Sequence, residues 1–136
     1  MQYTYIMRLL GIDYGSKRVG IAISDTDAGF AIPTSVIKNQ GDIEKLLKEV
    51  IELAEKNTIK EIVMGESKDF KGKDNAIMAE SLEFKKRLEQ LGFTVYMEPE
   101  FLTSFQAEKI QGKNDMLDAS AAALILQSFI DKRKNK

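Results

Sequence analysis

The stretch Leu9-Leu10-Gly11-Ile12-Asp13-Tyr14-Gly15-Ser16-Lys17-Arg18-Val19-Gly20-Ile21-Ala22-Ile23-Ser24-Asp25 decides the fold of this chain. Two apolar runs, residues 9–12 and 19–24, flank a turn bracketed by glycines, a pattern typical of a β-hairpin. Asp13 stands where the first run ends. An ionised carboxylate beside a sheet core is costly to desolvate unless a cation, a metal or hydrogen bonds compensate it. Asp13 is therefore the first candidate functional residue.

The residues after the hairpin predict a third strand and then a helix. Residues 30–37 form the strand, and Pro33 places it at an edge or an irregular point because proline cannot donate to a ladder. A stripe of apolar residues from Ile43 to Ala54 has helical spacing and follows Asp42, a suitable N-cap. Three antiparallel strands followed by an amphipathic helix of about four turns are therefore expected.

The second half of the chain alternates strands and helices. Residues 59–64 and 93–97 predict a fourth and a fifth strand, and residues 77–91 predict a helix that Gly92 ends. This alternation favours parallel pairing with crossover helices. We therefore predict an α/β fold with a central mixed five-stranded sheet, three antiparallel strands and then parallel strands, flanked by helices.

Two further helices are predicted toward the C-terminus. Thr103-Ser104-Phe105-Gln106 has the form of a capping box and predicts a short helix, which Gly112 ends. The last helix is expected to begin at Asn114 or Asp115 and to run to about Asp131. The basic tail at residues 132–136 is expected to fray, and residues 1–6 form an extension before Met7. All of this fits one domain over residues 1–136.

The composition narrows the chemistry. No apolar run reaches the roughly 18 residues of a membrane span, and the N-terminus has no signal-peptide pattern, so a cytoplasmic protein is expected. The chain has no cysteine and no histidine. Disulfides, thiolate metal sites, cysteine nucleophiles and imidazole bases are therefore excluded. The remaining catalytic residue types are Asp, Glu, Lys, Tyr, Ser and Thr, and their carboxylates suit chemistry with a hard ion such as Mg²⁺ or Mn²⁺.

Several acidic residues are expected to meet at the ends of the parallel strands, the usual ligand crevice of such sheets. They are Asp13, Glu66 after the fourth strand, Glu98 and Glu100 after the fifth, and Asp115 and Asp118 on one face of the last helix. The alternative is that Glu66 and Glu98 are ordinary strand-end charges and that Asp115 complements a helix dipole. A cluster of such carboxylates repels itself unless a divalent metal binds, and this metal can activate water against a phosphodiester.

The basic residues are clustered although the net charge is only −1. The clusters are Lys17-Arg18, residues 68–73, residues 85–87 and residues 132–136. Such clusters are usually solvated faces or tails, and a phosphate-binding surface is the alternative. Lys17, Arg18, Lys71 and Lys73 are the residues that we expect to contact nucleic acid.

Over residues 7–131 the chain resembles the YqgF or RuvX family of the ribonuclease H-like superfamily. The opening signature Gly11-Ile12-Asp13-Tyr14-Gly15-Ser16-Lys17-Arg18-Val19-Gly20-Ile21-Ala22-Ile23-Ser24-Asp25 is similar to that of the family, as is the closing helix Asp118-Ala119-Ser120-Ala121-Ala122-Ala123-Leu124-Ile125-Leu126-Gln127-Ser128-Phe129. Phe70-Lys71-Gly72 resembles the loop before the second long helix more loosely. Pro99-Glu100-Phe101-Leu102-Thr103-Ser104 stands in place of an Asp-Glu-Arg-Leu-Thr-Thr run, so only the glutamate of its first three residues is kept.

The resemblance implies a ribonuclease H-like fold and a nuclease. It implies that Asp13, Glu100 and Asp118 are the catalytic, metal-binding carboxylates, with Asp115 as an additional ligand candidate, and that Mg²⁺ or Mn²⁺ is the cofactor. The implied substrates are the 5′ end of the pre-16S rRNA or a branched DNA such as a Holliday junction. A homodimer is left open, because a symmetric junction requires two active sites.

Two other functions compete with a nuclease. Phe101 cannot contact phosphate as an arginine does, which leaves a catalytically degenerate nucleic-acid-binding or ribosome-assembly factor as an alternative. The run Gly11-Ile12-Asp13-Tyr14-Gly15 also fits the phosphate loop of an actin-like ATPase. Such enzymes need two lobes, and this chain has room for one.

Overall fold

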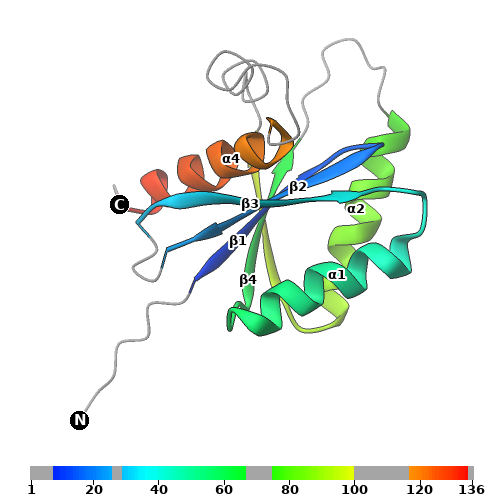
Figure 1. Cartoon of the computed structure of the whole chain (residues 1–136), viewed down its shortest axis with the longest axis horizontal. Coiled ribbons are helices and arrows are strands. Elements are labelled where there is room, and N and C mark those ends of the chain that lie inside the picture. The colour runs from blue at the N-terminus through cyan, green and yellow to red at the C-terminus, as the bar shows by residue number, and fades with distance from the viewer. Residues whose placement is uncertain (1–7, 26–28, 67–74, 100–116, 135–136) are drawn as a thin grey trace.

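The computed structural model describes residues 8–25, 29–66, 75–99 and 117–134. Eight elements lie in these ranges (Figure 1), in the order β1 Leu9–Tyr14, β2 Arg18–Ser24, β3 Ala31–Lys38, α1 Ile43–Lys56, β4 Glu61–Glu66, α2 Asn75–Gln90, β5 Thr94–Pro99 and α4 Leu117–Lys134. The predicted short helix at residues 103–112 lies outside the described residues. No described helix is both long enough and apolar enough to cross a bilayer.

The five strands form one mixed sheet in the order β3-β2-β1-β4-β5. β1 pairs antiparallel with β2 and β2 antiparallel with β3, whereas β1, β4 and β5 run parallel. The predicted sheet is therefore confirmed, and so is the position of Pro33, which lies in the edge strand beside a register shift at Ile21 and Ala22. The sheet twists strongly, so that β3 and β4 cross in Figure 1.

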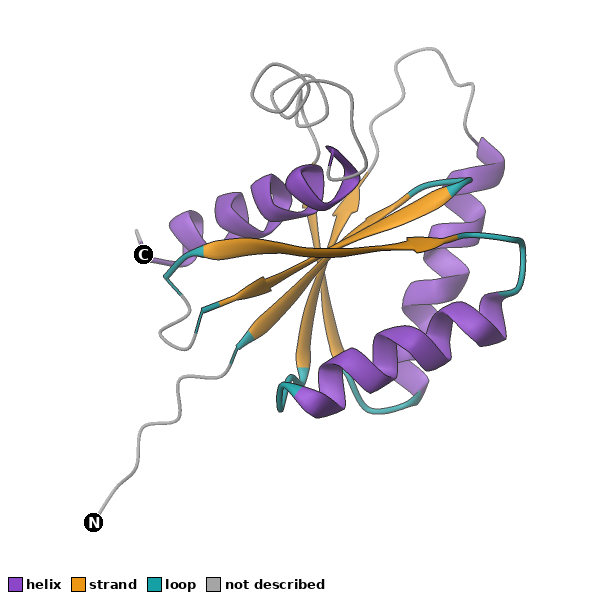
Figure 2. Ribbon diagram, viewed as in Figure 1, coloured by secondary structure: helices purple, strands orange, loops and turns teal. Residues whose placement is uncertain are grey.

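Two helices cover one face of the sheet (Figure 2). α1 begins at the predicted N-cap, because the Asp42 carboxylate accepts a hydrogen bond from the backbone N–H of Lys45 at 3.2 Å. The core on this face combines alternate strand residues with buried residues of the two helices, including Leu10, Ile12, Ile21, Ile62, Met64, Val50, Phe84 and Leu88. The helical stripe seen in the sequence is therefore the buried face of α1.

The fourth strand begins two residues later than predicted. The backbone N–H of Ile59 donates to the carbonyl of Ala54 at 2.8 Å, so Ile59 lies in the connection after α1 rather than in the sheet. Thr58 adopts the left-handed conformation with φ of 56° in the same connection. Ile59 is buried nonetheless, which explains why its apolar side chain was interpreted as part of the strand.

α4 alone covers the opposite face of the sheet among the described elements, and it packs closely against β1. A Cβ placed on Gly11 would lie 2.9 Å from the Cβ of Leu126 and 3.1 Å from the carbonyl oxygen of Ala122. Ala119, Ala121, Ala122 and Ala123 are all buried. Small side chains on the helix and a glycine on the strand together permit this contact.

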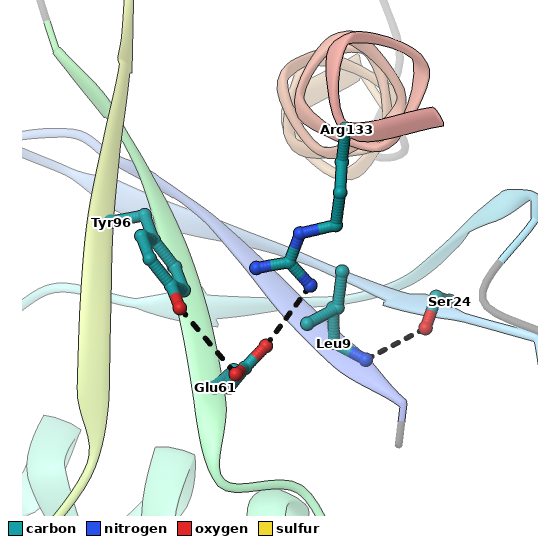
Figure 3. Close-up of polar contacts among 5 residues, drawn as sticks. All are labelled: Leu9, Ser24, Glu61, Tyr96 and Arg133. Carbon is teal, nitrogen blue, oxygen red and sulfur yellow. Dashed lines mark hydrogen bonds and ion pairs between the residues drawn. The ribbon is translucent and has the colours of Figure 1, made fainter. Parts of the chain in front are cut away.

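Residues 132–134 are helical, so for these residues the expectation of fraying from Lys132 onward was wrong, whereas residues 135–136 lie outside the described residues. α4 continues through Lys134. Lys132 donates to Glu98 at 2.7 Å, and Arg133 donates to Glu61 at 3.2 Å. Figure 3 shows the second contact, in which Tyr96 also donates to Glu61. The ion pairs of Lys132 and Arg133 join the last turn of α4 to β5 and β4.

Figure 3 also shows the backbone N–H of Leu9 donating to Ser24 Oγ, a contact between β1 and β2.

Substituting Gly11 by alanine tests the packing of α4 against β1. The new methyl group would force the helix away from the strand, so we expect a loss of about 1–3 kcal/mol in the free energy of unfolding, measured by urea denaturation. Gly29→Ala is the control, because only the flexible Lys134 Nζ, at 3.4 Å, lies near the added Cβ. Equal stability of the two variants would contradict the close contact.

Candidate active site

Asp13 lies near the carboxyl end of β1, on the face that α4 covers. Leu10 and Ile12 belong to the core beneath α1 and α2, whereas Leu9 packs with α4. Side chains alternate along a strand, so Asp13 shares its face with Leu9 and Gly11. Its partner in β2 is Gly20, which has no side chain. Asp13 is half-buried.

Asp118 lies in the first described turn of α4, one helical turn before Ala122. The Gln127 amide accepts from the backbone N–H of Ala31 at 2.8 Å, which ties the second half of α4 to the start of β3. Figure 1 shows the C-terminal end of α4 beside that part of β3. The helix therefore runs back along β1, and its first described turn lies toward the end of β1 that carries Asp13.

Glu98 also lies on the α4 face, in line with Asp13 across the sheet. Gly65 pairs with Glu98, and extending the β1–β4 register by one residue from Ile12 and Met64 places Asp13 beside Gly65. Two strand spacings of about 4.8 Å separate the backbones of Asp13 and Glu98, with a glycine between them. The two carboxylates therefore share one face and one row.

Glu98 has a structural role that the sequence did not reveal. Its side chain is 4% exposed, and its carboxylate accepts from Ser128 Oγ and Lys132 Nζ, each at 2.7 Å. A buried carboxylate needs such partners. These partners lie 30 and 34 residues away in sequence, so no local signal marked Glu98 as buried.

Glu66 lies on the opposite face from Asp13. Ile62 and Met64 pack beneath α1 and α2, and alternation along β4 places Glu66 with them. Glu66 is therefore not brought to the carboxylates on the α4 face. Glu66 and Glu98 therefore lie on opposite faces of the sheet, although both were expected to meet at the ends of the parallel strands.

The remaining predicted site residues lie outside the described residues. These are Glu100, Asp115, Lys71 and Lys73. Within the described ranges, no group of three or more acidic side chains could hold a metal ion. Asp13 does fit such a site in its chemistry, because its carboxylate offers hard oxygen atoms near the carboxyl end of β1, on the face that α4 covers.

The turn between β1 and β2 carries Lys17 and Arg18 and is tightly built. A Cβ on Gly15 would lie 2.6 Å from the carbonyl oxygen of Arg18, so only glycine fits there. Asn39 holds the turn from β3: its side-chain amide donates to the Gly15 carbonyl and its backbone N–H donates to the Lys17 carbonyl, both at 2.8 Å. Asn39 is 8% exposed.

Asn39 was missed in the sequence. Its contact with Gly15 spans 24 residues, and a single asparagine after a predicted strand is an ordinary turn residue. The backbone N–H of Gly41 donates to the Asn39 side-chain oxygen at 3.1 Å, and the Asn39 side chain also forms a hydrogen bond with Tyr14. The position of the basic turn therefore depends on a residue of the neighbouring strand.

Among the described residues, the basic clusters of α2 and α4 are partly neutralised by ion pairs. Lys85 pairs with Glu89 at 3.0 Å, and Arg87 pairs with Glu44. Lys132 and Arg133 pair with glutamates of the sheet. No ion pair among the described residues involves Lys17. Lys17 is therefore more available to an anionic ligand than the paired cations of these helices.

Tyr14 is next to Asp13 in sequence but lies on the other face, against Phe84 with ring centroids 5.2 Å apart. Burial and the neighbouring Glu80 carboxylate raise the pKa of Tyr14 to about 12, and a hydrogen bond with Asn39 acts in the opposite direction. Its hydroxyl donates to Glu80 at 3.2 Å. Tyr14 is therefore a neutral donor near neutral pH, and its high pKa disfavours a role as a general base.

The profile described as "RuvX: Holliday junction resolvase" matches residues 7–132. The chain belongs to the RuvX family. A relative from Caldanaerobacter subterraneus subsp. tengcongensis, named "Putative pre-16S rRNA nuclease", is 32% identical and covers 95% of this chain and 99% of its own length. A relative from Opitutus terrae with the same name is 33% identical and covers 93% of each chain.

Solved structures show the same fold. Thermus thermophilus RuvC in complex with a Holliday junction substrate matches with a TM-score of 0.64 at 17% identity, covering 94% of this chain and 96% of its own. The Fowlpox virus resolvase with Holliday junction DNA matches with a TM-score of 0.58 at 12% identity, covering 93% and 99%. The predicted family and the ribonuclease H-like fold are therefore confirmed for this RuvX protein.

The high pKa of Tyr14 predicts a loss of stability at alkaline pH. Folding favours the neutral phenol, so its contribution is complete below about pH 10, the unfolded pKa, and is lost as the pH rises from 10 toward 12. One of the four tyrosines should therefore ionise late in an ultraviolet absorbance titration, and Tyr14→Phe should remove that step. Identical stability profiles of the wild type and this variant between pH 9 and 11 would contradict the assignment.

Proposed function

We propose that this RuvX protein is a divalent-metal-dependent nuclease that hydrolyses phosphodiester bonds in structured nucleic acid. The observation that carries the proposal is the meeting of β1 and α4, which brings Asp13 and the backbone of Asp118 to the same end of the α4 face. Glu100 directly follows β5 in sequence and is the third proposed ligand. Asp115 is proposed as an additional ligand, one helical turn before Asp118 in sequence.

The proposed cofactor is Mg²⁺ or Mn²⁺, which carboxylate oxygens bind well. When bound, such an ion lowers the pKa of a water molecule and stabilises the leaving oxygen. The role of Asp13 is to hold the ion at a fixed place on a rigid strand. Lys17 and Arg18 would contact phosphates on the same side of the molecule, and Lys71 and Lys73 are proposed to extend these contacts.

The proposed substrate is the 5′ end of the pre-16S rRNA. The curated relatives with this activity in their names align over more than nine-tenths of the chain, which supports a nuclease of this class. Neither the metal nor the carboxylate chemistry distinguishes RNA from DNA. The proposal of an RNA substrate therefore rests on the names of these relatives.

The second candidate is resolution of branched DNA, which the description of the family favours. Cutting both strands of a symmetric junction needs two active sites, so this activity would require a homodimer. Comparing cleavage of a pre-16S RNA fragment with cleavage of a four-way DNA junction separates the two candidates. Sedimentation of the active species would show whether two copies are present.

Asp13→Asn tests the metal site. The substitution keeps the shape of the side chain but removes the charge, so we expect cleavage of a pre-16S RNA fragment in Mn²⁺ to fall by at least about a hundredfold. Calorimetry should show weakened Mn²⁺ binding. Asp25→Asn is the matched control, because that carboxylate accepts from the backbone N–H of Gly29 at the far end of β2.

Three results would change the proposal. Cleavage that survives Asp13→Asn would refute the assigned site and indicate a contaminating nuclease. No binding of Mn²⁺ at millimolar concentration by the wild type would favour a nucleic-acid-binding factor without catalytic activity. Equal loss in Asp13→Asn and Asp25→Asn would indicate a general effect on folding.

A further inference from the structure

Lys38 occupies an unfavourable position in the sheet. It is the last residue of β3 and pairs directly with Arg18, the first residue of β2. Like charges directly opposite each other destabilise a sheet. Both side chains are exposed, and no ion pair among the described residues involves Lys38. Lys38 is therefore an exposed cation to which an anion can bind.

The register places this pair of cations on the face that carries Asp13. Ile37 and Val19 pair with each other and lie in the core beneath α1 and α2, so Lys38 and Arg18 lie on the opposite, α4 face. Asp13 pairs with Gly20, which makes Arg18 its diagonal neighbour, about 7–8 Å away between backbones. Lys38 is one strand further out. An acid and two cations thus follow one another across β1, β2 and β3.

Asn39 holds the backbone next to Lys38 and Arg18 in place through hydrogen bonds. It directly follows Lys38, and its side chain and backbone hold the carbonyls of Gly15 and Lys17. The end of β3 and the β1–β2 turn are therefore joined by two hydrogen bonds of 2.8 Å. Buried hydrogen bonds of this kind restrict the backbone from which the cations project.

We propose that Lys38, together with Arg18, binds the phosphate backbone of the nucleic-acid substrate beside the carboxylate site, and that Asn39 positions both. The inference rests on the proposed function and extends it by assigning the path of the substrate strand from Asp13 across β2 to the edge strand β3. Lys38 contacts substrate away from the reacting phosphate. Asn39 is a positioning residue.

The test measures binding of a fluorescently labelled RNA hairpin with a single-stranded 5′ extension, by anisotropy at several salt concentrations. Asp13→Asn protein is used so that the RNA stays intact. Adding Lys38→Ser should weaken binding and lower the slope of log affinity against log salt by about 0.7–1, the value of one lost phosphate contact. Lys48→Ser is the matched control, because Lys48 is an exposed lysine on α1, beyond the opposite face of the sheet.

Asn39→Ala and Asn57→Ala separate positioning from stability. Each asparagine side chain both donates and accepts: Asn57 donates to Leu53 at 2.8 Å and accepts from Arg8 at 2.9 Å, at the C-cap of α1. Asn39 has an additional hydrogen bond with Tyr14. Both variants should lower the melting temperature. Only Asn39→Ala should weaken RNA binding, by several-fold at a temperature where both variants are folded.

The outcomes distinguish this inference from the proposed function. Equal salt slopes for Lys38→Ser and Lys48→Ser, with RNA binding by Asp13→Asn protein and cleavage by wild-type protein both intact, would overturn the role of Lys38 and leave the nuclease proposal standing. Unchanged affinity in folded Asn39→Ala would overturn the positioning role. If wild-type protein neither binds nor cleaves the RNA or a four-way DNA junction, the proposed function is wrong and this inference with it. In cleavage by otherwise wild-type protein, Lys38→Ser should raise KM and leave kcat unchanged.

Discussion

The contact between Gly11 and α4 is the constraint on which the site depends. The strand and the helix can approach closely only because Gly11 has no side chain, since an added Cβ would collide with Leu126 and with the Ala122 carbonyl. The same contact fixes the position of α4 relative to β1, and therefore the position of the Asp118 backbone relative to Asp13. Gly11 thus links the packing of the helix to the proposed metal ligand Asp13, which lies two residues later in the chain.

Charge is distributed unequally over the two ends of the molecule. The cations at the end of α4 pair with Glu98 and Glu61, and so they stabilise the fold rather than attract a ligand. Arg133 also stacks over Phe129, with its guanidinium carbon 4.8 Å from the ring centroid. At the other end, Arg18 and Lys38 oppose each other across the ladder. A chain with a net charge of −1 can therefore still present a local cationic surface.

Much of the fold could be predicted because its signals are local. The two apolar runs beside the glycine-bracketed turn, the helical stripe after Asp42 and the proline of β3 each reflect neighbouring residues, and the structure confirms all three predictions. Long-range contacts were not predictable in the same way. The burial of Glu98 depends on Lys132, and the basic turn depends on Asn39, and neither partner stands near the residue it contacts in sequence.

The edge strand β3 also bears on how the protein avoids aggregation. An edge strand offers unpaired backbone groups to any other strand, and the exposed Phe30 and Ile32, 69% and 50% exposed, would strengthen such an association. Pro33 interrupts this row of donors immediately after Ile32, and the adjacent register shift bends the edge. Pro33 therefore protects the exposed apolar segment at residues 30–32 from pairing with a strand of another molecule.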